Sequence, residues 1–193
     1  MPSLQQVSAK LDGVQLSTQI ADLETKAKYP IVFIDASKIN SRLDPQKAYM
    51  VMSGSSDITT LTVKLNNLKI GTAMLDMSPA GTNIGSEVNL KEKKFSKVGQ
   101  ALAEGCTRVA IAAGQGQQIG LYAPGDSVLF HAKMGFSFDS GFQNAIVAQE
   151  LAQGKKVSSQ SGEMKIQPLS IQAPFGVTPR LAQLLSSNAA SLR

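Results

Sequence analysis

The stretch Phe130-His131-Ala132-Lys133-Met134-Gly135-Phe136 decides the fold of this chain. A helix is expected to begin at Asp126, because a short acidic side chain can accept hydrogen bonds from the first helical turn. Gly135 is expected to end that helix, since glycine readily adopts the left-handed conformation found after helix ends. Phe136-Ser137-Phe138 then predicts the start of a strand. The stretch therefore places a helix directly before a strand.

A pair of antiparallel strands is predicted upstream of this helix. Residues 58–65 alternate in polarity and are rich in β-branched side chains, which is typical of a strand with one buried face. Asn66-Asn67 predicts a turn, and residues 69–77 resume the strand pattern. After a loop over 79–83, residues 85–90 can form a third antiparallel strand.

A basic segment separates these strands from the next elements. Lys91-Glu92-Lys93-Lys94 leads into residues 95–105, which predict a helix. Residues 108–113 are apolar and predict a core strand, and the glycine- and glutamine-rich residues 114–125 predict a mobile loop. The central order is thus three strands, a basic loop, a helix, a strand, a loop, a helix and a further strand.

The flanking segments carry their own local signals. Apolar spacing from Leu4 to Leu23 predicts a helix that is broken near Gly13 and ended by Pro30, and residues 31–34 predict a buried strand. The remaining expectations are a short helix opened by Asp44-Pro45, a helix over 143–153, an exposed loop over 154–163, an edge strand over 164–166 and a terminal helix over 179–192.

Length and composition bound the class of protein. A chain of 193 residues with 42% hydrophobic and 17% charged residues fits one globular domain. It contains no run of about 18 apolar residues and no secretory signal pattern. Cys106 is the single cysteine, so no intramolecular disulfide can form, which fits a reducing compartment and a cytoplasmic location.

Charge and residue types exclude several kinds of function. The net charge of +5 suggests an anionic partner, but the scarcity of aromatic residues argues against sequence-specific nucleic-acid binding. One histidine and one cysteine cannot build a typical zinc site, so no metal is expected. No G-x-S-x-G elbow appears, and residues 114–120 lack the features of a phosphate-binding loop. Cys106 is expected to be a buried small hydrophobe.

Residues 58–140 resemble the core of the GNAT N-acetyltransferase superfamily, on the order of elements and on the Gly135-Phe136 ending. The resemblance implies a mixed α/β fold with a central, mostly antiparallel sheet flanked by helices. The sheet would splay between the third hairpin strand and residues 108–113. We expect one domain over 1–193, in which residues 1–57 and 141–193 diverge from the family core.

The resemblance also implies a site for coenzyme A. The family pattern Q/R-x-x-G-x-G/A falls on Lys94-Phe95-Ser96-Lys97-Val98-Gly99, where Lys94 and Lys97 replace the usual residues. Backbone N–H groups at a helix N-terminus suit a pyrophosphate. The residues implied in cofactor binding are Val88, Asn89 and Leu90 beside the pantetheine arm, and Lys94, Ser96, Lys97, Val98, Gly99 and Gln100 around the pyrophosphate. The alternative interpretation is a solvated basic stretch before an ordinary helix.

Three side chains are candidates for proton transfer. His131 stands where the family carries a tyrosine that protonates the departing thiolate, and its ordinary pKa suits that role. Tyr122 is the rival acid, and Glu87 is the available general base. Each has a structural alternative: His131 can be half-buried and bonded to a carbonyl, and Glu87 can be solvated.

The resemblance implies an acyltransferase that moves an acetyl or other acyl group from acyl-coenzyme A to an amine. The acceptor would be a small-molecule amine or a protein or peptide amine, and a homodimer is compatible with the sequence. The altered cofactor loop favours an alternative, a GNAT-shaped binding protein without catalytic activity. A secreted bacterial effector that acts in a host cytosol is compatible with either function.

Overall fold

A computed structural model describes residues 1–41, 43–78, 80–171 and 179–186. Its nine strands form one curled sheet in the order β7-β1-β2-β3-β4-β5-β6-β8-β9. The pairs β2–β3 and β6–β8 are parallel, and the other neighbours are antiparallel. This architecture confirms the expected mixed α/β fold class with a central, mostly antiparallel sheet flanked by helices. Within the described residues, no helix has the length and apolar content needed to cross a membrane.

The predicted hairpin is confirmed. Strand β4 (Ile58–Leu65) pairs in antiparallel register with β5 (Leu68–Ser78), and Asn66 in the turn has a φ of 53°. Strand β6 (Gly81–Asn89) extends the pair and begins inside the predicted loop. Strand β3 (Ala48–Gly54) lies on the other side of β4, where the sequence indicated only a helix at Asp44-Pro45. That expectation is wrong, because Asp44 and Pro45 lie in the turn before β3.

The N-terminal segment is a helix followed by a hairpin rather than a broken helix. Helix α1 (Leu4–Leu11) ends before Gly13, and β1 (Gln15–Asp22) pairs with β2 (Lys28–Ile34), which includes the predicted strand. Buried and exposed side chains alternate along β1, so that Leu16 and Ile20 enter the core. A 3-10 helix, η1 (Ala36–Ser41), joins β2 to β3. The short β7 (Phe95–Ser96) completes this edge by pairing with β1.

The predicted core strand over 108–113 is wrong. These residues form the second half of α2 (Val98–Ala112), a helix that is buried on nearly all sides between the sheet, α1 and α5. A short apolar run in a buried helix has no polar face, so its periodicity cannot distinguish it from a buried strand. The strand beside β6 is instead β8 (Ile119–Ala123), which lies inside the predicted mobile loop.

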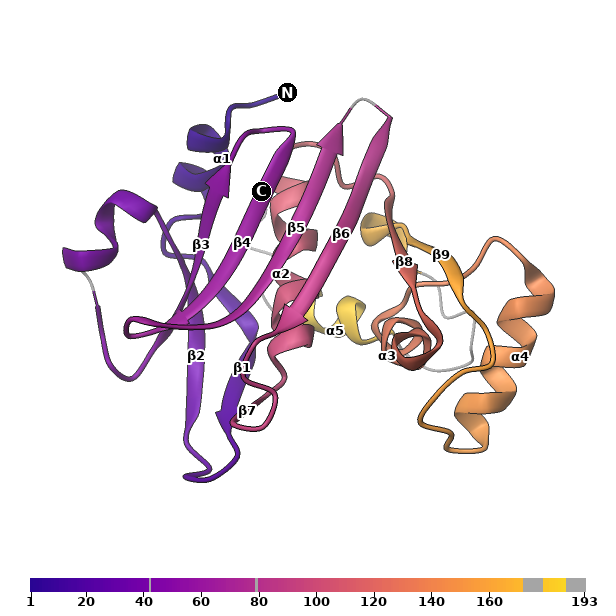
Figure 1. Cartoon of the computed structure of the whole chain (residues 1–193). Coiled ribbons are helices and arrows are strands. Elements are labelled where there is room, and N and C mark those ends of the chain that lie inside the picture. The colour runs from indigo at the N-terminus through magenta and orange to yellow at the C-terminus, as the bar shows by residue number, and fades with distance from the viewer. Residues whose placement is uncertain (42, 79, 172–178, 187–193) are drawn as a thin grey trace.

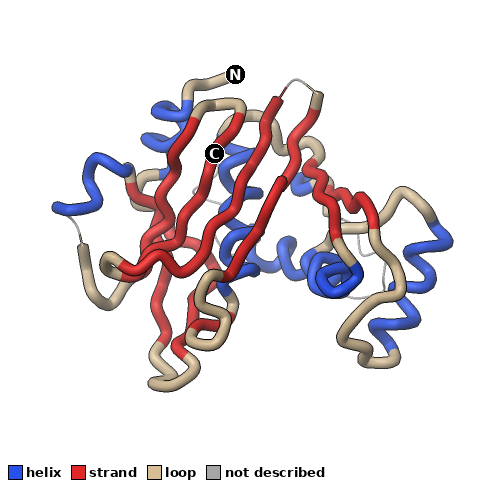
Figure 2. The backbone as a smooth tube through the Cα atoms, in the orientation of Figure 1, coloured by secondary structure: helices blue, strands red, loops and turns tan. Residues whose placement is uncertain are grey.

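The elements from β8 to β9 gather at one end of the sheet (Figure 2). Helix α3 (Gly125–Met134) follows Pro124 as its N-cap, so Asp126 lies in the first turn and is not the cap. Gly135 ends the helix with a φ of 116°, as expected. Residues 136–138 make only an isolated bridge between Ser137 and Lys165, where a strand was expected. The elements that follow are α4 (Gly141–Ala152), the edge strand β9 (Gly162–Ile166), a short 3-10 helix, η2 (Pro168–Ser170), and α5 (Arg180–Ser186).

These later elements agree with the expected helix over 143–153 and the edge strand over 164–166. Residues 187–192 of the expected terminal helix lie outside the described residues. Helix α2 crosses one face of the sheet, and α3 and α4 lie at the β8–β9 end (Figure 1). Cys106 is fully buried as expected, but on α2 rather than before a strand.

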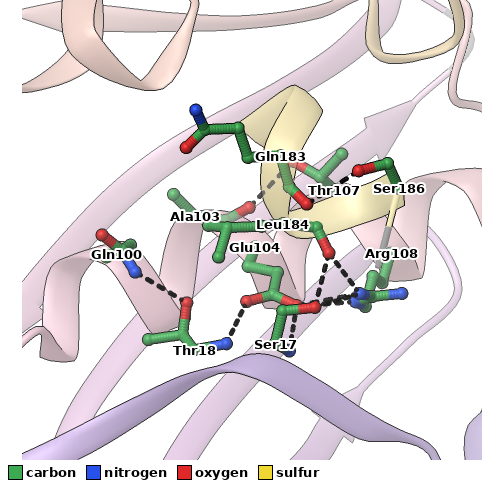
Figure 3. A network of polar contacts seen from close by, with 10 residues as sticks. All are labelled: Ser17, Thr18, Gln100, Ala103, Glu104, Thr107, Arg108, Gln183, Leu184 and Ser186. Atoms are coloured by element: carbon green, nitrogen blue, oxygen red, sulfur yellow. Dashed lines mark hydrogen bonds and ion pairs between the residues drawn. The ribbon is translucent and has the colours of Figure 1, made fainter. Parts of the chain in front are cut away.

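A buried ion pair on α2 connects this helix with β1 and α5 (Figure 3). Glu104 and Arg108 are completely buried, and Arg108 Nη2 lies 2.9 Å from Glu104 Oε1. The Glu104 carboxylate accepts backbone N–H bonds from Ser17 and Thr18 at 2.7 and 2.9 Å, at the irregular part of β1. Arg108 donates to the Leu184 carbonyl on α5 at 3.0 Å. The pair therefore satisfies backbone groups that the sheet and α5 leave open.

Candidate active-site cleft

The sheet opens into a cleft where β6 and β8 part. The two strands pair only from Thr82 to Ile84 and from Ile119 to Leu121. Beyond this point β6 continues to Asn89, and the first turns of α2 and α3 face the widening gap. The resulting cleft has a volume of about 680 Å³. The predicted separation of two neighbouring strands is therefore present, but the strand beside β6 is β8 and not residues 108–113.

An irregularity at Gly85 turns the far part of β6 toward the helices. Met74 pairs with Ser86 and Leu75 with Ile84, so Gly85 is an extra residue in the strand. Such a bulge shifts which side chains face each side of a sheet. Ile84 enters the core before the bulge, and Glu87 points toward α2 after it. A glycine inside a strand pattern was the available sequence signal for this bulge.

The same strand presents open backbone groups to the cleft. Leu90 donates its N–H to the Ile70 carbonyl on β5. Backbone groups of successive residues in an antiparallel strand point to opposite sides, so Val88, two residues before Leu90, also faces β5. Glu87 and Asn89 therefore direct their N–H and C=O groups toward the parted edge. Among the predicted pantetheine contacts, the geometry places only the Asn89 backbone at this edge, and it adds Glu87.

The side chains of Val88, Asn89 and Leu90 are either exposed or bonded to the loop that follows β6. Val88 exposes 43% of its surface, and Leu90 is also exposed. The Asn89 side chain donates to the Phe95 carbonyl at 3.2 Å and accepts from the Lys91 N–H at 2.9 Å. This side chain therefore shapes the loop between β6 and α2.

Glu87 is a half-buried residue that lines the cleft and turns its carboxyl group inward. Its Oε1 would lie 2.9 Å from a Cβ added at Gly99, so the carboxyl group sits against the first turn of α2. Its Oε2 is buried and has no hydrogen-bond partner among the described residues. Burial raises the pKa of Glu87 to about 8. The group is therefore mostly protonated at neutral pH and is not the solvated carboxylate of the alternative interpretation.

His131 also lines the cleft and is only 8% exposed. Its ring packs edge-on against Phe130 and Phe136, with centroids 5.0 and 5.7 Å apart. The buried Nδ1 has no hydrogen-bond partner in the described part of the chain. Burial lowers the pKa of His131 to about 4, because the positive form would lose its hydration. His131 is thus a neutral imidazole at physiological pH.

This lowered pKa predicts an acid-sensitive fold. The unfolded chain binds the His131 proton near pH 6.5 and the folded chain only near pH 4, so stability is complete above pH 6.5 and falls as the pH drops to 4. The difference is roughly 2 kcal/mol at pH 5. His131→Phe should remove this loss, so the melting temperature of the variant relative to the parent should rise between pH 8 and pH 5. An equal difference at both pH values would contradict a buried neutral imidazole.

Tyr122 lines the cleft from β8 but exposes 68% of its surface. It follows Leu121, the last residue of β8 that pairs with β6. The rival acid therefore stands at the rim, whereas His131 and Glu87 lie within the wall.

The lysines of the loop before α2 are exposed. Lys94 places its Nζ 5.5 Å from the centre of the Phe95 ring, and Ser96 pairs with Ala21 on β1. Lys97 is the N-cap of α2 in the left-handed conformation, with a φ of 66° and no side-chain cap bond. This conformation strains a residue other than glycine, and it is the position where the family pattern has its first glycine.

The first turn of α2 contributes backbone groups rather than side chains. Val98 is buried, and the Gln100 side chain donates to Thr18 at 3.0 Å and accepts from Arg180 at 3.4 Å. Gly99 faces Glu87 and also Phe130, whose ring carbon would lie 3.5 Å from an added Cβ. The sequence pattern indicates no role for Phe130. Its contact with Gly99, across the gap between α3 and α2, places it in the lining of the cleft.

No family model matches the sequence, and no curated relative matches it. Among solved structures, the chain is similar to a PaiA N-acetyltransferase from Thermoplasma acidophilum in complex with coenzyme A, at 18% identity and a TM-score of 0.43 over 57% of this chain and 61% of that one. It is also similar to nourseothricin acetyltransferase, at 15% identity and a TM-score of 0.42 over 81% and 88% of the two chains.

A third similar structure is N-acetylglutamate synthase from Neisseria gonorrhoeae, complexed with coenzyme A and N-acetyl-glutamate. It shares 13% identity at a TM-score of 0.39, over 56% of this chain and 25% of that one. This chain covers 61% of the PaiA N-acetyltransferase and 25% of the N-acetylglutamate synthase, so it spans less than two thirds of the length of either protein. The strand order of this chain and the parting of β6 from β8 are properties of its own sheet.

Proposed function

We propose that this protein transfers an acyl group, most simply acetyl, from acyl-coenzyme A to a primary amine in the cleft between β6 and β8. The observation that carries this proposal is the open edge of β6, which lies beside the uncapped first turn of α2 and the buried carboxyl group of Glu87. An extended amide-bearing arm can pair with such an edge as an added strand. A helix N-terminus beside it suits a phosphate group.

The chain's own residues would perform the binding. The backbone groups of Glu87 and Asn89 would pair with the amides of the pantetheine arm, and the N–H groups of Val98, Gly99 and Gln100 would face the pyrophosphate. Acyl-coenzyme A would supply the activated thioester. Holding the amine beside the thioester carbon supplies much of the rate acceleration.

Glu87 is proposed to move the proton. Its ionised form takes a proton from the incoming amine as the amine nitrogen attacks the thioester carbon, and the C–S bond then breaks. The carboxylic acid returns this proton to the departing thiolate, because its pKa of about 8 is close to that of an ordinary thiol. His131, as a neutral imidazole, can donate a hydrogen bond to the sulfur without carrying charge.

The charge of the cleft favours a cationic acceptor. The described residues that line the cleft include three carboxyl groups, Glu87, Glu92 and Asp126, and no lysine or arginine, so the charge in the cleft comes from Glu92 and Asp126. Asp126 lies in the first turn of α3, where its charge is stabilised by the helix. An ammonium group entering this cleft would be attracted and would give its extra proton to water, which leaves the neutral amine that attacks the thioester. Small-molecule amines and protein or peptide amines both meet this requirement.

Acetyl-coenzyme A is expected to stabilise the folded protein. A ligand at one hundred times its Kd adds about 2.7 kcal/mol to the free energy of unfolding. Thermal melting with and without millimolar acetyl-coenzyme A measures this, with free pantetheine as a weaker ligand and the nucleoside uridine as an unrelated control. An unchanged melting temperature at millimolar acetyl-coenzyme A would disprove the proposal.

One observation favours a non-catalytic binding protein as the second candidate. Lys97 holds a strained left-handed conformation at the N-cap where a glycine would let phosphates approach the backbone closely. Release of free thiol from acetyl-coenzyme A with a panel of primary amines separates the two functions. Cofactor binding without thiol release at pH 8 would favour the second.

A further inference from the structure

One face of the sheet is uncovered over β4, β5 and β6. Helix α2 packs on these strands from the other side, where α1 and α5 also lie. On the uncovered side, Ile39 of η1 packs against a small cluster on β2 and β3. No described helix lies over the remaining strands (Figure 1). We call this surface the open face, and its side chains are those of Ile58, Thr60, Thr62 and Lys64 on β4, Lys69, Thr72, Met74 and Asp76 on β5, and Asn83, Ser86 and Val88 on β6.

The centre of the open face is built from methyl-bearing side chains. Met74 pairs with Thr60, and Val88 pairs with Thr72, so these groups lie beside one another across the strands. Ile58, Met74 and Val88 are exposed although they are large and apolar. A contiguous exposed apolar surface marks an interaction site more often than an ordinary wet surface. Two such sheet faces can pack about 10 Å apart, so this composition suits contact with a second sheet.

The charged side chains of the open face lie at its two ends. Lys64 and Lys69 are paired across β4 and β5, at the end next to the hairpin turn. Asp76 lies at the other end opposite Ile58, and the exposed Asp57 directly precedes Ile58. None of these four charged side chains has an ion-pair partner among the described residues. The open face therefore has a basic end and an acidic end, roughly 20 Å apart along β5.

This charge pattern is complementary to itself in one of two simple orientations of a second copy. Two identical surfaces that meet across a two-fold axis contact each other reciprocally. An axis that runs across the strands lays each strand antiparallel to the same strand of the second copy. Lys69 then faces Asp76 of the second copy, and Asp76 faces its Lys69. An axis parallel to the strands would instead place lysines against lysines, which is repulsive.

We infer that the open face packs on the open face of a second copy of this chain, in a two-fold dimer whose stacked strands run antiparallel. Sheets that pack in this way keep their strands within about 30° of each other. Thr72 and Met74 lie near the axis, and the ion pairs close the two ends. Ser86 and Val88 also line the cleft, so the second copy lies beside its mouth. The inference does not depend on the proposed acyl transfer.

Sedimentation velocity of the full chain measures this dimer. The parent should pass from the mass of one chain to twice that mass between about 1 µM and about 200 µM, as a micromolar Kd requires. Thr62→Arg places charges at the desolvated centre of the contact and should abolish the dimer. Asp76→Lys sets lysines against lysines and should weaken the dimer by roughly tenfold or more. Lys10→Glu, a charge change on α1 away from the open face, should leave it unchanged.

An exchange of charges tests the orientation of the two copies. Lys69→Asp/Asp76→Lys restores opposite charges at both ends of the contact, so it should recover most of the affinity that Asp76→Lys alone loses. The melting temperature of each variant identifies any that does not fold.

Three results would each overturn the inference. A parent that remains a single chain at about 200 µM would show that the open face is a solvated surface. A dimer that tolerates Thr62→Arg would use another surface. A double variant that dimerises no better than Asp76→Lys would exclude the antiparallel stack.

Discussion

Glu87→Gln is expected to slow acyl transfer by about 100-fold or more and to abolish its rise with pH, because a positioned general base typically contributes this much. With a pKa of about 8, the ionised fraction of Glu87 increases roughly tenfold per pH unit below 8 and levels off above it. The parent's kcat/KM for the amine should follow that curve. The measurement is thiol release from pH 6 to pH 9.5 at saturating acetyl-coenzyme A.

The same substitution has a second, opposite effect on stability. The unfolded chain ionises Glu87 near pH 4.5, whereas the folded chain keeps it protonated to about pH 8, so stability falls as the pH rises between these values. At pH 7 the cost is up to roughly 3 kcal/mol, which a neutral glutamine avoids. Glu87→Gln should therefore melt several degrees higher than the parent at pH 7 and equally at pH 4.5. If Glu87→Gln were both slower and less stable than the parent, the substitution would instead have disturbed the packing around the cleft.

Arg108→Met is expected to destabilise the fold by about 3–5 kcal/mol, because it leaves the fully buried Glu104 carboxylate without its counter-charge. It also removes the hydrogen bond that holds the Leu184 carbonyl on α5. Chemical unfolding in urea measures the loss, which is a large share of the stability of an ordinary domain.

A double variant and a surface pair provide the controls for Arg108. Glu104→Gln/Arg108→Met should recover part of the loss, since no unpaired charge then remains in the core. Lys165→Met breaks the exposed pair with Asp139, which is 2.6 Å long, and should cost less than about 1 kcal/mol. If Arg108→Met and Lys165→Met cost the same, the buried pair does not stabilise the junction of β1, α2 and α5.

Local signals determined the elements that the sequence predicted correctly. Three of these signals depend only on neighbours within a few residues, and each is present in the structure. They are the alternation over 58–65, the turn at Asn66 and the helix end at Gly135. The expected splay of the sheet is also present, although the strand beside β6 is Ile119–Ala123 and not 108–113. The short apolar run over 108–113 is ambiguous, because a helix buried on all sides shows no amphipathic period.

The sequence by itself determined that this is one mixed α/β chain with a central hairpin, a helix that stops at Gly135 and a single histidine beside that stop. Tertiary structure alone decided the chemistry available to the cleft. The bulge at Gly85 turns Glu87 toward α2, and His131 is buried with its ring against Phe130 and Phe136. Desolvation then moves the pKa of Glu87 up and that of His131 down, so both are mainly uncharged at pH 7. Burial depends on residues far apart in the chain, which is why the sequence could name these two groups but not their protonation states.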